Sequence, residues 1–340
     1  MKVLLTGILG YIGAFMGEAL QEAHHRVTGL DTGYYARSVL YDKRRAAPSV
    51  IHKDIRRVTE EDVTGYDAVL HLGELSNDPL GQLDPTLTHQ INHAGSVGLA
   101  KLCKKAGVPR FIYSSSCSVY GTGNGEFKDE QSPVSPQTAY AECKARVERE
   151  VAELADDRFS PTFLRNATAF GLAPHFRFDL VLNNLSGLAA TTGEIRMSSD
   201  GSPWRPLVHV RDICRAFVCA LEAPREAVHN QVFNVGDTKE NYRVREVAEI
   251  VAQAFPGCKI ATGNGDKDSR SYRVSFDKIR QALPGFACAM TALDGARELK
   301  DIFDRIHLTR ELFEHRAFIR LKQIRHLLAT SQIDHQLFWN

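Results

Sequence analysis

The cysteines of this sequence lack the spacing of a disulfide framework or a zinc site. There are seven among 340 residues, an odd number, and none stands in a Cys-x-x-Cys pair. Structural zinc sites and small disulfide-linked proteins use closely paired cysteines, so we expect reduced thiols and no bound metal. Reduced thiols are typical of a cytoplasmic protein, which is the location we predict.

Long apolar runs and an excess of charge of one sign are also missing. No apolar stretch reaches the roughly 18 to 20 residues that a membrane-spanning helix needs. The 42 Lys and Arg residues balance 41 Asp and Glu residues, a net charge of +1, so nothing predicts binding to nucleic acid or to an anionic membrane. The composition, 43% hydrophobic and 24% charged, is that of an ordinary folded protein.

Short apolar runs alternate with amphipathic segments along the first half of the chain. Strands are predicted over residues 3–5, 26–30, 68–72, 110–113 and 162–165, and helices over residues 12–23, 86–105 and 140–154. Strands that alternate with helices form right-handed crossovers, which build a parallel sheet covered by helices on both faces. We therefore predict an α/β fold with a Rossmann-type, doubly wound parallel sheet and a smaller α/β C-terminal substrate-binding lobe.

The first predicted strand runs into a glycine-rich turn, TGILGYIG at residues 6–13, that opens the first helix. In a dinucleotide-binding fingerprint, Gly7 would permit the tight turn, Gly10 would let the backbone approach the pyrophosphate, and Gly13 would let helix and strand pack closely. The helix N-terminus would then receive the phosphates. Three glycines can also occur in an ordinary loop. The dinucleotide interpretation is favoured because Asp31, at the end of the second predicted strand, is placed to accept hydrogen bonds from ribose hydroxyls.

Asp31 also bears on the choice between two dinucleotides. Its carboxylate would repel the additional phosphate of NADP, so NAD is favoured, although Arg37 nearby would weaken that preference. Asp54 lies in the segment Lys53-Asp54-Ile55, which is predicted to end another short strand. That position suits the edge of the adenine ring and an exposed surface equally well.

The chain is long for a single hydrophobic core, which favours two lobes. The dinucleotide-binding domain is predicted over residues 1–165 with return segments at about 206–235, and the substrate-binding lobe over residues 166–205 and 236–340. The last forty residues carry apolar side chains at helical spacing. They are predicted to form a helical cap that docks on the body of the protein.

Tyr140 and Lys144 lie one helical turn apart, on the same face of the helix predicted at residues 140–154. A tyrosine beside a positive charge gives up its proton more readily, so it can act as a general base toward a hydroxyl group. Many helices contain such a pair by chance. The segment SSSCSVYG at residues 114–121, directly after a predicted strand, gives this pair more weight.

Together these motifs resemble the extended short-chain dehydrogenase/reductase family, in particular its NAD-dependent nucleotide-sugar epimerase/dehydratase branch, which includes the UDP-galactose 4-epimerases. The resemblance extends over nearly the whole chain to about residue 280. Further matching segments are His71-Leu72, Asn92, Asn183-Asn184-Leu185, Asp200-Gly201, Arg205 and Phe233-Asn234-Val235-Gly236.

The resemblance implies roles for particular residues. Ser116 would hold and polarise the reacting oxygen, Tyr140 would be the acid/base, and Lys144 would bind the nicotinamide ribose and lower the pKa of the tyrosine. The implied NAD contacts are Gly7, Gly10, Tyr11, Ile12, Gly13, Asp31, Asp54, Ile55, Leu72, Gly73, Tyr140 and Lys144. The implied contacts of a nucleotide-diphosphate sugar substrate are Ser116, Ser118, Asn184, Arg205 and Arg270. A homodimer through the helices at residues 86–105 and 140–154 is also implied.

The residues beside Ser116 narrow the reaction. In a dehydratase of this branch an acidic pair occupies the positions of Cys117 and Ser118, and elimination of water needs a general acid there. A buried, inert thiol is the favoured interpretation of Cys117, although it would also suit a base. The predicted function is therefore an NAD-dependent nucleotide-sugar epimerase acting at C4, through a ketosugar that is reduced again on its opposite face. The alternatives are an NAD(P)-dependent nucleotide-sugar reductase or dehydrogenase, or a dehydratase of the same family.

The sequence departs from the family pattern in two places. Glu74 follows Gly73 where the family has two small residues, which puts a carboxylate near the expected cofactor pocket. It either faces away from the pocket or changes the chemistry there. The segment at residues 164–168 replaces the aromatic and asparagine pattern that is usual beside the nicotinamide.

Overall fold

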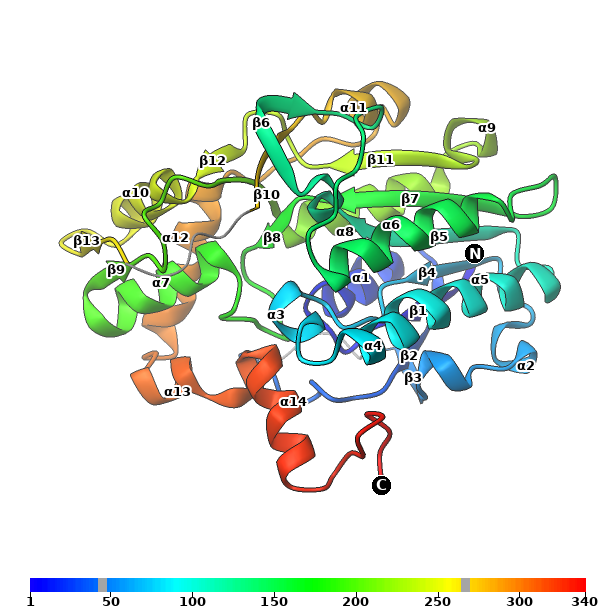
Figure 1. The fold of residues 1–340 in the computed structure, drawn as a ribbon, viewed down its shortest axis with the longest axis horizontal. Coiled ribbons are helices and arrows are strands. Elements are labelled where there is room, and N and C mark those ends of the chain that lie inside the picture. The colour runs from blue at the N-terminus through cyan, green and yellow to red at the C-terminus, as the bar shows by residue number, and fades with distance from the viewer. Residues whose placement is uncertain (42–47, 264–269) are drawn as a thin grey trace.

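The computed structural model describes residues 1–41, 48–263 and 270–340. At its centre lies a seven-stranded sheet in the order β11-β7-β5-β4-β1-β2-β3, in which all neighbouring strands are parallel (Figure 1). Its strands are β1 (Lys2–Thr6), β2 (Arg26–Asp31), β3 (Ser49–His52), β4 (Ala68–His71), β5 (Arg110–Ser116), β7 (Ser160–Asn166) and β11 (Gln231–Val235). The strand order reverses between β1 and β4, and doubly wound folds bind ligands in the crevice at such a reversal.

Helices cover both faces of this sheet. On one face lie α1 (Tyr11–Glu22) and α8 (Val210–Glu222), which pack against each other. On the other face lie α4 (Pro85–Thr88), η2 (His89–Gly95), α5 (Ser96–Lys105) and α6 (Ala139–Ala152) (Figure 1). The helix predicted at residues 86–105 is thus continuous from α4 to α5, but its middle, η2, is one stretch of π-helix.

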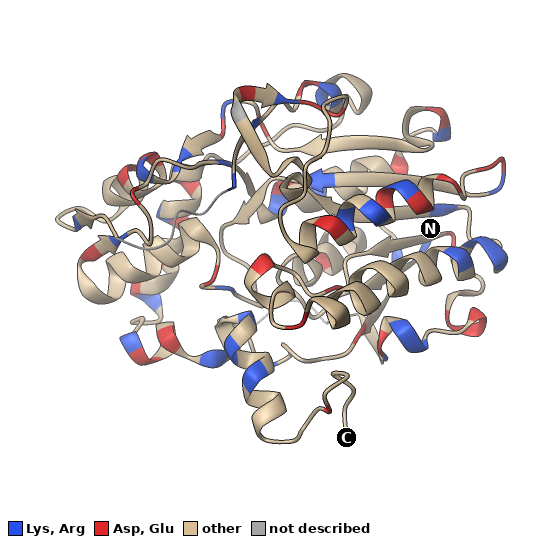
Figure 2. Ribbon diagram, in the orientation of Figure 1, with Lys and Arg blue, Asp and Glu red and all other residues tan. Residues whose placement is uncertain are grey.

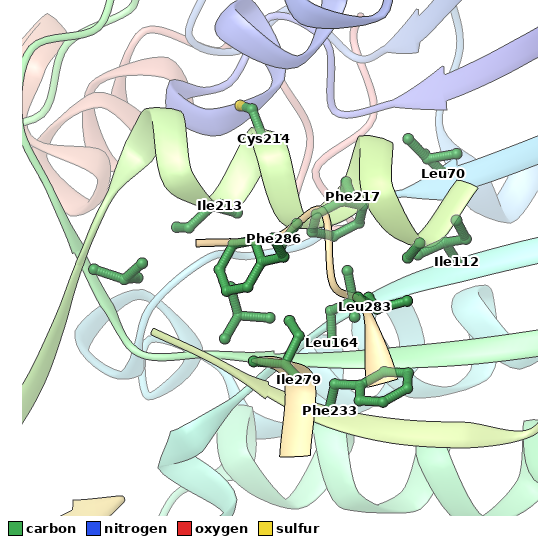
Figure 3. Close-up of a cluster of buried hydrophobic side chains, with 14 of the residues drawn as sticks. Leu70, Ile112, Leu164, Ile213, Cys214, Phe217, Phe233, Ile279, Leu283 and Phe286 are labelled. Carbon is green, nitrogen blue, oxygen red and sulfur yellow. The ribbon is translucent and has the colours of Figure 1, made fainter. Parts of the chain in front are cut away.

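The two faces of the sheet carry separate hydrophobic cores. Val3 and Leu5 of β1 belong to the core under α1 and α8, whereas Leu4 between them belongs to the core under α5 and α6. This alternation is the period of two expected of a strand that is buried on both faces. Figure 3 shows part of the first core, which includes Phe217 of α8 and Phe233 of β11. Full burial of one such side chain contributes about 1.5–3 kcal/mol.

The second lobe is built from small sheets and helices. Its sheets pair β8 (Thr168–Phe170) and β12 (Asn241–Arg243) with β10 (Trp204–His209), β9 (Glu194–Arg196) with β13 (Lys259–Ala261), and β6 (Thr122–Lys128) with β14 (Ser271–Val274). The helices α7 (Val181–Thr192), α10 (Val244–Ala254) and α12 (Ala292–Arg305) pack against one another around a third core.

The remaining elements are short, apart from the C-terminal helix. They are η1 (Ile55–Arg57), α2 (Glu60–Val63), α3 (Asp78–Gly81), η3 (Cys117–Tyr120), α9 (Arg225–Val228), α11 (Asp277–Ala282), α13 (Arg310–Glu314), η4 (Arg316–Phe318) and α14 (Arg320–Ala329). After α14 the last residues run beneath β2 and β3 (Figure 1).

The predicted fold class is confirmed by this sheet, its flanking helices and the additional lobe. The short strand predicted at residues 53–55 is wrong, because β3 ends at His52 and Asp54 caps η1 by accepting the Arg56 N–H at 2.8 Å. An aspartate that bonds the backbone two residues on favours a turn over a strand. Of the return segments, β11 joins the central sheet whereas β10 lies in the sheet of the lobe. The exact division into domains stays a prediction.

Acidic and basic residues are interspersed along the outer helices (Figure 2). In the described part of the chain, no helix combines the length and apolar character needed to cross a membrane. Among the same residues, no group of three or more His, Cys, Asp and Glu side chains is placed to hold a metal ion.

Candidate active site

A cavity of about 640 Å³ runs along the carboxyl ends of the central strands and on between the sheet and the lobe. The structure brings all of the sequence-predicted site residues to its wall. These are Gly7, Gly10, Tyr11, Ile12, Gly13, Asp31, Asp54, Ile55, Leu72, Gly73, Ser116, Ser118, Tyr140, Lys144, Asn184, Arg205 and Arg270. Residues that are up to 263 positions apart in the sequence, Gly7 and Arg270, therefore line one space.

The glycine turn between β1 and α1 leaves no room for side chains. Gly7 has a φ of +76°, and a Cβ there would lie 2.8 Å from the carbonyl carbon of Leu72. A Cβ on Gly13 would lie 2.0 Å from the carbonyl oxygen of Gly7. No side chain caps the N-terminus of α1 at Gly10. The turn and the uncapped helix end thus form the cradle that a pyrophosphate requires, so these residues fit the predicted dinucleotide.

Asp31 and Asp54 both line the cavity, but their carboxylates differ in the hydrogen-bond partners that they already have within the protein. The Asp31 carboxylate accepts the backbone N–H groups of Leu9 at 2.9 Å and Gly33 at 2.8 Å, which fix its orientation. Burial raises the pKa of Asp31, although both hydrogen bonds oppose the shift. The Asp54 carboxylate is held by the Arg56 guanidinium through bonds of 2.9 and 2.7 Å. Asp31 is therefore the more open acceptor for a ribose.

Ser116, Tyr140 and Lys144 converge at the other end of this crevice. Ser116 ends β5 and its Oγ accepts the N–H of Ser118 at 3.1 Å. A side-chain hydrogen bond joins Ser116 to Tyr140, which lies in the first turn of α6. The Lys144 Nζ lies 5.5 Å from the centre of the Tyr140 ring and also donates to the Ser114 carbonyl. A hydroxyl, a phenol and an ammonium are thus placed together.

Glu74 faces into this cluster, which settles the first departure noted in the sequence. Its side chain is only 2% exposed, and its Oε2 forms an ion pair with Lys144 Nζ at 2.7 Å. Its Oε1 accepts hydrogen bonds from Tyr113 OH at 2.7 Å and Ser96 Oγ at 2.9 Å. Behind it, burial lowers the pKa of His71 to about 4, so that side chain is neutral. Glu74 is thus the charged partner of the lysine.

This carboxylate alters the balance of charge at Tyr140. Burial raises the pKa of Tyr140, Lys144 lowers it, and Glu74 raises it again, so the net shift is upward. The effect expected of Lys144 is present, but it is not the dominant one. Burial alone would lower the pKa of Lys144, yet Glu74 and Tyr140 raise it above its ordinary value. The lysine is therefore held firmly in its charged form.

A buried ion pair lies directly behind these residues. Arg165 of β7 contacts Glu148 of α6, with Nη2 to Oε2 at 2.6 Å and Nε to Oε1 at 3.0 Å. Ser115 of β5 also donates to Glu148, and Arg165 donates to the Tyr120 hydroxyl at 3.0 Å. This explains part of the second departure in the sequence, because Arg165 joins the strands to α6. Only the following residues of that segment, from Asn166 on, reach the cavity wall.

The lobe contributes the basic end of the cavity. Arg205 Nη1 donates to the carbonyl oxygens of Trp204 at 2.8 Å and Arg270 at 2.5 Å. Arg270 in turn forms an ion pair with Asp78 of α3. The N-terminus of α7 has no side-chain cap and lies at the same wall near Asn184. Two guanidinium groups and an open helix end suit an anionic ligand.

Several buried polar atoms on this wall have no hydrogen-bond partner among the described residues, and two of them, Ser118 Oγ and Asn166 Oδ1, lie in the segments that follow β5 and end β7. Because buried polar atoms are nearly always satisfied, such atoms at a cavity wall indicate contacts that a polar ligand completes.

Several cavity residues were missed by the sequence motifs. They are Tyr34, Tyr35, Asp78, Asn166, Arg177, Asp179, Arg196 and Arg320. Tyr34 and Tyr35 closely follow Asp31, so their place after β2 was a usable signal. Arg177 and Arg320 belong to no motif, and no local pattern would have found them.

The sequence profile of the NAD dependent epimerase/dehydratase family matches residues 3–236. A UDP-glucose 4-epimerase from Corynebacterium glutamicum is 27% identical over 282 residues, covering 78% of this chain and 81% of that protein. A UDP-N-acetyl-alpha-D-glucosaminuronate decarboxylase from Bacillus cytotoxicus is 24% identical over 286 residues, covering 82% and 84%. The structure of TunA, described as an NAD dependent NDP-hexosamine 5,6-dehydratase involved in tunicamycin biosynthesis, has a TM-score of 0.79 at 22% identity and covers 92% of this chain and 99% of TunA.

These relatives carry the names of three different reactions, so the family alone does not choose among them. The family does decide the cofactor, and the predicted NAD is confirmed. The resemblance drawn from the motifs is confirmed as well. The profile match spans more than half of the residues, and the chain belongs to the NAD dependent epimerase/dehydratase family.

Proposed function

We propose that the protein is a nucleotide-sugar epimerase that acts at C4 of the sugar. The observation that carries the proposal is the convergence of Ser116, Tyr140 and Lys144 beside a cofactor crevice. The two positions after Ser116 hold Cys117 and Ser118, neither of which is a carboxylic acid. Cys117 is 1% exposed, lies outside the cavity wall, and has its pKa raised by burial. These features favour oxidation and re-reduction over elimination of water.

In the proposed reaction Tyr140 removes the proton of the sugar hydroxyl, and the Ser116 hydroxyl holds the same oxygen. NAD, when bound, accepts the hydride that leaves the oxidised carbon and later returns it to that carbon. The ketosugar turns over between these two steps, so the hydride arrives on its opposite face. Tyr140 then gives the proton back to the oxygen. Lys144 holds its charge beside the phenol throughout, which favours the deprotonated form.

The diphosphate of the substrate is proposed to lie at the basic end of the cavity. Arg205 and Arg270 offer guanidinium groups there, and Asn184 lies on the open first turn of α7. A planar guanidinium suits phosphate oxygens because it donates two parallel hydrogen bonds. Turnover of the ketosugar then requires only that the sugar moves while its diphosphate stays bound.

The helix face formed by α4, α5 and α6 is proposed to pair with the same face of a second copy. The molar mass in solution tests this dimer, and a monomer at micromolar concentration would contradict it.

All seven cysteines are unpaired, which supports the proposed cytoplasmic location.

The reaction can be tested by incubating the protein with UDP-, dTDP-, GDP- and ADP-sugars. We expect NMR to show a new C4 stereoisomer of one sugar, with no net change in the absorbance of reduced nicotinamide. The Tyr140→Phe variant, run in parallel, serves as the control for contaminating activity. Sustained formation or consumption of NADH would instead identify a dehydrogenase or reductase, and a product lacking one water would identify a dehydratase.

Glu74 predicts a particular pH dependence. Its charge raises the pKa of Lys144 and contributes to raising that of Tyr140. Glu74→Gln keeps the shape but removes the charge, so both pKa values should fall. Because activity needs a deprotonated phenol and a charged ammonium, both limbs of the pH profile of kcat/KM should move to lower pH.

The matched control for this experiment is Glu142→Gln, on the same helix as Tyr140, whose side chain is 44% exposed. The pH profile of kcat/KM of this control variant should match that of the unaltered protein. Thermal unfolding of both variants checks that they are folded. A Glu74→Gln profile that is unchanged, or that moves to higher pH, contradicts a role of Glu74 in setting the charge of the cluster.

A further inference from the structure

Two buried arginines line the cavity away from the catalytic cluster. Arg320, the first residue of α14, is 1% exposed, and neither Nη1 nor Nη2 has a hydrogen-bond partner among the described residues. Arg177, between β8 and α7, is 6% exposed, and its Nη2 lacks a partner in the same way. Buried guanidinium groups are normally paired, so unpaired nitrogens on a cavity wall indicate an anionic ligand.

The side chains around the pair do not neutralise it. Asp179 accepts the Nε–H of Arg177 at 2.8 Å, but from Arg320 it receives only the backbone N–H, at 3.1 Å. The Arg320 guanidinium lies over the ring of Tyr35, 4.0 Å from its centre. Burial, followed by the charge of Arg177, lowers the pKa of Arg320 to about 10. The guanidinium of Arg177 thus has one carboxylate partner, that of Arg320 has none within hydrogen-bond distance among the described residues, and three donor nitrogens remain unused.

The pair lies near both ends of the cofactor crevice. Asn183 donates to the carbonyl of Arg177 at 3.0 Å and to the hydroxyl of Tyr11, in the first turn of α1, at 3.3 Å. The Arg320 guanidinium lies over Tyr35, which closely follows the predicted ribose acceptor Asp31, and apart from Asn183 all of these residues line the same cavity. A dinucleotide that extended from Asp31 to the N-terminus of α1 would share this cavity wall with the two guanidinium groups.

The C-terminal segment that carries Arg320 is fixed to the loops that follow β2 and β3. Gln323 donates to the carbonyl of Tyr34 at 3.1 Å, and the Trp339 indole donates to the carbonyl of Thr32 at 2.6 Å. The hydroxyl of Tyr34 donates to the carbonyl of Leu337.

The loop after β3 contacts the same segment. The guanidinium groups of Arg56 and Arg57 lie 4.0 and 3.7 Å from the centre of the Phe338 ring. The segment thereby holds both loops of the adenosine end and positions Arg320.

We propose that Arg177 and Arg320 bind the diphosphate of NAD from the side opposite the N-terminus of α1, so that the C-terminal segment forms one wall of the cofactor site. The proposal depends on NAD as the cofactor and not on epimerisation. The geometry gives the diphosphate two planar guanidinium groups in addition to the dipole of the helix, each suited to bidentate contact. The 2′-phosphate of NADP is the less favoured anion, because the Asp31 carboxylate lies beside that position.

The test is a comparison of ligand fragments on protein freed of nucleotide. Calorimetric titration should show that Arg320→Met weakens NAD and ADP by roughly 10- to 100-fold, the loss expected for hydrogen bonds to a charged group. Adenosine, which has no phosphate, should bind as it does to the unaltered protein. UDP should bind unchanged to protein saturated with NAD. Arg325→Met, an exposed arginine on the same helix, is the matched control and should bind all four ligands normally.

Different outcomes would overturn the proposal. Equal weakening of adenosine and ADP would mean that Arg320 only supports the adenosine loops, and loss of UDP affinity would place the pair in the substrate site. Tighter binding of NADP than NAD by the unaltered protein, lost in Arg320→Met, would assign Arg320 to a 2′-phosphate. If Arg320→Met does not fold, Arg320→Lys and Arg177→Lys keep the charge but lose the planar fork. Each should then weaken ADP without weakening adenosine, and unchanged ADP binding would reject the proposal.

Discussion

Replacement of Tyr140 by phenylalanine should reduce turnover by about 10²- to 10⁴-fold, the range expected for loss of a general acid/base. The phenol hydroxyl is the group placed to exchange a proton with the substrate, because it is hydrogen bonded to Ser116 and lies near the Lys144 ammonium. Phenylalanine fills the same volume without that hydroxyl. Steady-state kinetics with the substrate identified by NMR would measure the loss in kcat.

The same variant should still bind NAD, because the glycine cradle and Asp31 remain in place. Retained NAD, measured by absorbance after denaturation, therefore separates loss of chemistry from loss of the site. Tyr66→Phe removes a hydroxyl of a residue that is not part of the cavity wall, and it provides the matched control. A Tyr140→Phe enzyme that keeps more than about a tenth of the activity would rule out the proposed acid/base.

Glu148→Ala should lower the free energy of unfolding by about 3–5 kcal/mol, the cost of removing one partner of a buried ion pair. The carboxylate is 8% exposed and accepts hydrogen bonds from two nitrogens of Arg165 and from the hydroxyl of Ser115. Its removal leaves the Arg165 guanidinium buried and uncompensated between β7 and α6. Urea denaturation followed by circular dichroism measures the change.

Two further variants make this measurement decisive. Glu150→Ala removes a carboxylate from the same helix that is 35% exposed and pairs with His93 at the surface, so its cost should stay under about 1 kcal/mol. Replacing both Glu148 and Arg165 by methionine removes the unpaired charge and should recover part of the lost stability. Similar small losses in Glu148→Ala and Glu150→Ala would show that the buried pair contributes little.

The sequence could predict those structural features that depend on residues close together along the chain. The strand, glycine turn and helix at the N-terminus follow from local pattern, and so does the spacing of Tyr140 and Lys144. The orientation of Glu74 could not be predicted, because it depends on Lys144, Tyr113 and Ser96 from three other elements. A sequence shows a carboxylate near a pocket but not which charge it meets.

The error at Asp54 and the omission of Arg320 have different physical causes. At Asp54 a local hydrogen bond to the Arg56 backbone ended the strand early, a competition that apolar periodicity does not record. Arg320 meets Asp179 from 141 positions away and Tyr35 from farther still. Contacts of that kind arise from how the lobe is threaded, and no motif in a single sequence reports them.

The docking of the last residues on the loops after β2 and β3 bears on how the protein matures. Tyr34 and Leu337 are hydrogen bonded although 303 positions separate them, so a ribosome makes one long before the other. A nascent chain contains the glycine cradle and Asp31 early, but it lacks the segment docked beside them until residues 320–339 have been made. Stalled chains that already retain NAD would contradict this order. We therefore expect NAD to be retained only by chains in which residues 320–339 have been made and have docked.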